Sequence, residues 1–91
     1  MFNVKVEGLE RVQKELAELA DATAALDGTL CNVRFDPSNA DSVREAISEM
    51  EKAVDTKTAR WRSNSAVREI AQRSKERFRK AILDQASAAR R

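Results

Sequence analysis

Residues 37–69 read PSNADSVREAISEMEKAVDTKTARWRSNSAVRE, and this stretch holds the start signals of two helices. Pro37 stops the segment before it, and the side chain of Ser38 or Asn39 can accept hydrogen bonds from the free amides of a first helical turn. The apolar and small residues that follow recur at helical spacing, at Val43, Ala46, Ile47, Met50, Ala53 and Val54. This pattern predicts an amphipathic helix over residues 39–60.

A second cap signal, Ser63 or Asn64, opens the next apolar pattern. Apolar and small residues again share one helical face, at Val67, Ile70, Ala71, Ser74, Phe78, Ala81, Ile82 and Gln85. No proline or glycine interrupts this segment. We therefore predict another helix over residues 64–88.

The amino-terminal segment alternates apolar and polar residues, with Phe2, Val4 and Val6 at every second position. A period of two residues is typical of a strand that is buried on one face. The alternation predicts a strand over residues 2–7, which Gly8 ends.

The period changes to three and four residues immediately after this glycine. The positions concerned form a narrow apolar seam: Leu9, Val12, Leu16, Leu19, Thr23 and Leu26. The seam predicts a helix over residues 9–26 that packs against another helix. Asp27 and Gly28 end it, because glycine can adopt the left-handed conformation that often closes a helix.

A second alternating stretch lies at residues 29–36, where Cys31, Val33 and Phe35 share one side. It predicts another half-buried strand, with Cys31 as a small core residue. We therefore expect a single α+β domain over residues 1–91, mostly α, in which a strand-helix-strand unit precedes two amphipathic helices. Two strands make a poor sheet, so a partner chain is expected to complete it.

Charge is divided unevenly along the chain. Residues 1–56 carry six Lys/Arg against twelve Asp/Glu, and residues 57–91 carry eleven against three. A basic helix prompts a nucleic-acid hypothesis, in which phosphates would contact Arg68, Lys75 and Arg79. That stripe has no aromatic residue on which bases could stack, so we favour pairing of the basic helix with acidic surface on the same subunit or on the next copy.

Three apolar side chains are further candidates for an interface. Trp61 continues the apolar face of the helix predicted over residues 39–60, and we favour a core or inter-helix position for it. An interface anchor is the alternative, because tryptophan is enriched at the centres of protein interfaces. Leu16 and Leu19 lie in the seam. If the seam is packed, Leu16→Asp should lower the stability of the fold by several kcal/mol.

The composition argues against enzymatic and cofactor chemistry. The chain has no histidine, no tyrosine and one cysteine, so the usual general bases, activated nucleophiles and zinc ligands are missing. We predict a protein that is not an enzyme, with no catalytic residue, cofactor or metal. No long apolar run or signal-peptide pattern is present, which predicts no membrane partner.

Several segments resemble small proteins encoded among the head-completion and tail genes of tailed bacteriophages and prophages. The resemblance covers residues 36–87 and rests on the DP opening, on AISEME, on VDTK and on KERFR before AIL. The stretch VKVEGLERVQKEL at residues 4–16 is similar to the start of phage neck and tail-completion proteins.

This resemblance implies a structural or assembly role in a phage particle, in the neck or tail, through protein–protein contacts. The implied partners are other copies of the chain and neighbouring phage structural proteins, and the implied location is the virion, assembled in the bacterial host cytoplasm. A phage-encoded regulator that binds DNA or a host protein, for example an inhibitor of host defence, is the alternative.

Overall fold

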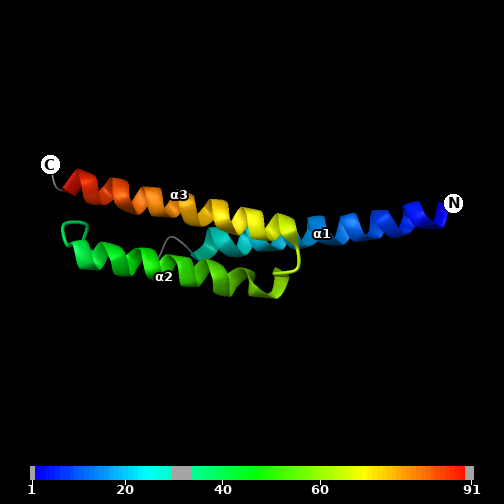
Figure 1. Cartoon of the computed structure of the whole chain (residues 1–91), viewed down its shortest axis with the longest axis horizontal. Coiled ribbons are helices and arrows are strands. Elements are labelled where there is room, and N and C mark those ends of the chain that lie inside the picture. Colours follow the sequence, from blue (N-terminus) through cyan, green and yellow to red (C-terminus); the bar gives the residue numbers. More distant parts are fainter. Residues whose placement is uncertain (1, 30–33, 90–91) are drawn as a thin grey trace.

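The computed structural model describes residues 2–29 and 34–89, which form helices joined by short connections (Figure 1). Helix α1 spans Phe2–Thr29, α2 spans Ala40–Thr58, the short 3-10 helix η2 spans Ala59–Trp61, and α3 spans Ser65–Ala89. The molecule is elongated, with extents of 64 × 20 × 17 Å.

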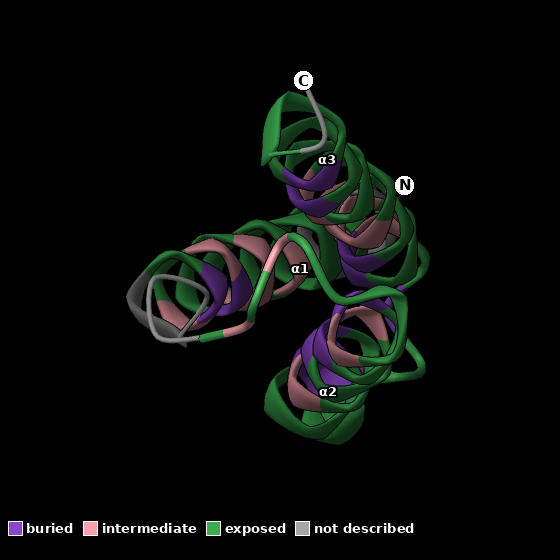
Figure 2. Ribbon diagram, turned by 90° about the vertical axis from the view of Figure 1, so that its left-hand side faces the viewer, coloured by how far each residue is buried: buried purple, intermediate pink, exposed green. Residues whose placement is uncertain are grey.

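The three long helices are staggered. Helices α2 and α3 form an antiparallel hairpin that turns at η2, and the carboxyl-terminal half of α1 packs against the turn end of this hairpin (Figure 1). The amino-terminal half of α1 extends beyond the turn, while the opposite end of the hairpin extends beyond the end of α1. Each helix has its buried residues on one side, as the end-on view shows (Figure 2).

The start of α2 is built by the cap that the sequence predicts. The Oδ1 atom of Asn39 accepts hydrogen bonds from the amides of Asp41 at 2.9 Å and Ser42 at 3.1 Å. In the preceding turn, the Ser38 hydroxyl and amide donate to the Asp36 carboxylate at 2.6 and 3.0 Å, and these bonds lower the pKa of Asp36. Of the two candidate caps, Asn39 is the one used.

Asn39→Ala should therefore lower the free energy of unfolding by about 1 kcal/mol, because two amides of the first turn lose their acceptor. Chemical denaturation followed by circular dichroism measures this loss. Asn39→Ser, which keeps a side-chain acceptor, is the matched control and should retain most of the stability. Equal losses in both variants would contradict the capping role.

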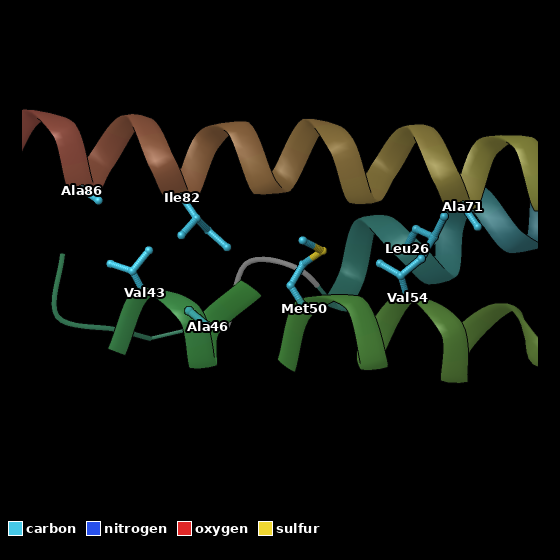
Figure 3. Close-up of a cluster of buried hydrophobic side chains, with 8 residues drawn as sticks. All are labelled: Leu26, Val43, Ala46, Met50, Val54, Ala71, Ile82 and Ala86. Carbon is cyan, nitrogen blue, oxygen red and sulfur yellow. The ribbon is translucent and has the colours of Figure 1, made fainter. Parts of the chain in front are cut away.

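The main core lies between the helices of the hairpin and is closed by the end of α1 (Figure 3). It contains Leu26, Val43, Ala46, Met50, Val54, Ala71, Ile82 and Ala86. A second, smaller cluster joins α1 to the turn and consists of Ala22, Trp61 and Val67, with Leu19 packed against it. The hairpin is therefore held along its length, whereas α1 is held near one end.

The strand predicted over residues 2–7 is wrong, because α1 is one continuous helix from Phe2 to Thr29. A lone strand would leave its amides without partners, whereas a helix satisfies them within the segment. Glycine inside a helix costs about 1 kcal/mol relative to alanine but does not forbid the conformation. Gly8 has open space around it and interrupts nothing.

The strand predicted over residues 29–36 is also wrong for residues 29 and 34–36, which the structure describes. Thr29 belongs to α1, residues 34–36 are irregular, and Phe35 packs against the main core. Residues 30–33, with the predicted core positions Cys31 and Val33, lie outside the described part of the chain.

The α+β fold class is therefore wrong: residues 2–29 and 34–89 contain helices and no strand. The expectation that a partner completes a sheet is therefore wrong as well. The helices predicted over 39–60 and 64–88 coincide with α2 plus η2 and with α3.

Candidate interaction surfaces

Three large apolar side chains on the projecting half of α1 face solvent. Leu9, Val12 and Leu16 are 58%, 51% and 59% exposed, and we call them the α1 stripe. They stand three and four residues apart, so they share one helical face over two turns. The sequence predicted Leu16 as a packed seam residue, and the structure corrects this. The turn of the hairpin reaches the neighbouring residues Glu15 and Glu18 through Asn64, but the side chain of Leu16 stays exposed.

The seam divides where α1 meets the hairpin. Leu19 is partly buried against the cluster of Ala22, Trp61 and Val67, and Leu26 lies in the main core. The periodicity of the seam gave no sign of this division, because it continues unchanged from the solvent-exposed half into the packed half.

Trp61 lies inside the molecule and not on its outer surface. Trp61 is 8% exposed, and the Arg60 guanidinium stands 4.8 Å from the centroid of its ring. The tryptophan thus forms the junction between α1 and the hairpin, which agrees with the core reading of this residue.

Asn64 fixes the same junction by hydrogen bonds. Its Oδ1 accepts from the amides of Ala66 at 3.0 Å and Val67 at 3.3 Å, which caps α3. Its Nδ2 donates to the Glu15 carbonyl oxygen at 3.2 Å and to the Glu18 carboxylate at 3.1 Å, which ties the turn to α1. The local sequence pattern predicted the cap. It did not predict the hydrogen bonds to α1, because nothing in the pattern indicates a partner 46 to 49 residues away.

Two of the predicted phosphate contacts are engaged within the chain. Arg68 donates from Nη1 to the Arg62 carbonyl oxygen at 2.6 Å. Lys75 Nζ lies 2.5 Å from a carboxylate oxygen of Asp55 on α2, and the lysine side chain is only 21% exposed. Arg79, the third candidate, is exposed one turn further along α3.

A groove between α2 and α3 brings several of these side chains together. It has a volume of about 410 Å³, and we call it the hairpin groove. Its lining is Asp55, Thr58, Ala59, Arg62, Val67, Arg68, Ala71, Gln72 and Lys75, without a residue of α1 among the described ones. A second hollow of about 330 Å³ lies toward the open end of the hairpin, beside Val43, Leu83 and Ala86.

The described residues offer no group of His, Cys, Asp or Glu side chains placed to hold a metal ion. Within the same part of the chain, no helix combines the length and the apolar character needed to cross a bilayer.

Comparison with known proteins places the chain in a family. A family model described as YuaX matches residues 6–91. A protein of Escherichia coli (strain K12) with the printed name "Uncharacterized protein YuaX" is 38% identical over 89 residues, which covers 98% of this chain and 92% of that protein. No solved structure matches. The chain therefore belongs to the YuaX family.

Proposed function

We propose that this protein is a non-enzymatic assembly protein that binds another protein chain through the α1 stripe. The observation that carries the proposal is the exposure of Leu9, Val12 and Leu16, each more than half accessible on a helix that projects from the rest of the molecule. Fully burying a leucine or valine side chain is worth about 1.5–3 kcal/mol, so a partner that covers the stripe gains several kcal/mol.

The pattern of exposure supports binding more than catalysis. Large apolar side chains scattered singly over a surface need no explanation, but three on one helical face form a contiguous patch of the kind that marks protein contacts. If α1 were packed against the hairpin along its full length, these three side chains would lie against a neighbouring helix.

A role in the neck or tail of a phage particle is the more specific form of this proposal. It rests on the resemblance of residues 36–87 to phage-encoded proteins, and the name of the YuaX family refers to no particle. Detection of the chain by mass spectrometry in purified particles, at a fixed ratio to the major structural proteins, tests it. Absence from the particles would confine the protein to a role outside them.

The regulator that binds DNA receives less support. Lys75 is paired with Asp55, so this cation would have to leave a carboxylate before it contacted phosphate, and Arg68 already donates one of its five N–H groups to a backbone oxygen. An affinity for DNA that falls steeply with salt would favour the regulator, because phosphate contacts release counterions.

Leu16→Asp separates binding from folding. In the isolated chain, under conditions where it is monomeric, the free energy of unfolding should change by less than about 0.5 kcal/mol, because position 16 is solvated. Binding should be lost, because a carboxylate would be buried in the contact. A photoreactive amino acid at Val12 reports the contact in cells: the chain without a second substitution should give a crosslinked product, and Leu16→Asp should abolish it.

Ala17→Asp is the matched control. Ala17 is also exposed, and the substitution adds the same charge one position away from the stripe. It should keep the crosslinked product. Loss of stability in Leu16→Asp comparable to that of a core variant, or retention of the product, would contradict the proposal.

A further inference from the structure

We infer that the α1 stripe binds the α1 stripe of a second copy of the chain, so that the projecting halves of two α1 helices pack side by side in opposite directions. The projecting half comprises residues 2–16, from the start of α1 to the end of the stripe. This inference rests on the proposed function and names the partner of the stripe.

The α1 stripe continues a helical face that already packs against other helices. Its three- and four-residue steps lead on to Leu19, which is partly buried at the turn, and then to Leu26 in the main core. Such spacing makes a seam that packs against a facing helix. The hairpin supplies the facing helices only beside the second half of α1 (Figure 1), so the helix that faces the stripe has to come from another chain. The α1 helix of a second copy carries the same seam and therefore matches the stripe.

The net charge of the projecting half permits pairing between copies. Residues 2–16 carry three Lys/Arg against three Asp/Glu, and the acidic excess of α1 lies in residues 17–29, which carry none against three. Residues 40–58 of α2 carry three against five, and residues 65–89 of α3 carry six against three. Two copies of α2 or of α3 would therefore repel each other, whereas two projecting halves of α1 would not.

The charged side chains beside the stripe also leave it accessible to a second helix. At 3.6 residues per turn, Glu10, Arg11 and Lys14 lie on the side of α1 opposite to the stripe. Glu15 lies nearer to it, and its carboxylate is paired with Arg11 of the same copy at 3.3 Å. Gly8 flanks the stripe with open space around it, so it presents no side chain that would hold a partner helix away. Along the stripe, a second helix can therefore cover the apolar side chains without the burial of an unpaired charge.

The stagger of the helices determines the direction of the contact. The hairpin packs against the carboxyl-terminal half of α1 and leaves the projecting half beyond its turn (Figure 1). If two α1 helices ran in the same direction, both hairpins would lie at the same end of the pair and would compete for space. In the antiparallel arrangement the hairpins lie at opposite ends, and a twofold axis passes near Val12 in the middle of the stripe. Leu9 of each copy then lies near Leu16 of the other.

Disulfide trapping between copies tests this arrangement. All variants carry Cys31→Ser, which removes the one native thiol. A copy with Leu9→Cys, mixed under mild oxidation with a copy of different mass that carries Leu16→Cys, should give a covalent product of one copy each. The matched control replaces Leu9→Cys by Glu10→Cys, because Glu10 is exposed one position away on the other side of α1. The mixed product should form about tenfold faster than the control product, because only cysteines that face each other reach the geometry of a disulfide.

Two outcomes of the trapping experiment would overturn the inference. Equal rates for Leu9→Cys and Glu10→Cys would show that the stripes of two copies do not face each other. Faster trapping of Leu9→Cys with itself than with Leu16→Cys would show that the two helices run in the same direction.

Sedimentation equilibrium gives an independent measurement. The unmodified chain should approach the mass of two copies at a concentration on the order of 100 µM. Leu16→Asp should raise the dissociation constant by about a hundredfold or more, because each contact would bury two carboxylates. Ala17→Asp should leave it within about twofold of the unmodified chain. A single-chain mass of the unmodified chain at every concentration would overturn the inference.

The Val12 crosslink in cells separates this inference from the proposed function. A product with twice the mass of the chain supports both. A product that contains another protein and no second copy overturns the inference and leaves the proposed function standing. The absence of any product, together with a single-chain mass in sedimentation, overturns both.

Discussion

Met50→Ala is expected to lower the free energy of unfolding by about 2–4 kcal/mol. Met50 is 1% exposed and lies in the middle of the main core. Its side chain points from α2 toward α3, one turn before Val54 on the same helix (Figure 3). Its truncation removes contacts on several sides at once and leaves a cavity that the stiff helices cannot close. Urea denaturation followed by circular dichroism gives the value.

Leu83→Ala is the control for this substitution. It removes a side chain of similar size from the same hairpin, but Leu83 is 44% exposed and lies outside the core clusters, so the loss should stay below about 1 kcal/mol. If both variants lost the same stability, the hairpin would not be packed around Met50. The loss of about 3 kcal/mol expected for Met50→Ala is a large fraction of the total free energy of unfolding of a chain of 91 residues.

Asn64→Ala should lower the free energy of unfolding by about 3 kcal/mol, because one substitution removes both the cap of α3 and the two hydrogen bonds to α1. The cap is worth about 1 kcal/mol, and each hydrogen bond to α1 adds about 1 kcal/mol, somewhat more for the bond to the Glu18 carboxylate. The side chain is 4% exposed, so water does not readily replace these partners. Thermal denaturation measures the overall loss.

Asn64→Asp divides the two roles. An aspartate still accepts hydrogen bonds from the amides of Ala66 and Val67, but it cannot donate to Glu15 or Glu18 and places a second negative charge beside Glu18. Amide hydrogen exchange should rise in the docked half of α1 and stay unchanged at the start of α3. If the exchange rates changed equally in both helices, Asn64 would not be the residue that holds α1.

The parts of the fold that the sequence predicts correctly are those set by local chemistry. Asn39 and Asn64 mark the starts of α2 and α3, and the spacing of Val43, Met50 and Val54 identifies the buried face of α2. Caps and periodicity act within a few residues, so they can be recognised without knowledge of the tertiary structure.

The errors arise where the result depends on distant contacts. The alternation of Phe2, Val4 and Val6 suits a strand, yet α1 continues through it, because no neighbouring strand is available among the described residues and a spacing of four residues from Phe2 to Val6 also suits a helix. In the seam, Leu16 and Leu26 occupy equivalent positions in sequence, but only Leu26 reaches the hairpin. How far α1 overlaps the hairpin is set by the whole assembly of helices and leaves no local signal.

The placement of Trp61 makes the attachment of α1 visible to optical spectroscopy. It is the one indole of the chain, and it packs with Ala22 of α1 and Val67 of α3, at the point where the first helix meets the other two. Its fluorescence therefore reports the polarity of that junction without an added dye. A red shift of the emission while the helical signal of the hairpin persists would signify that α1 has separated from an intact hairpin, whereas a simultaneous change of both would signify that the three helices unfold as one unit.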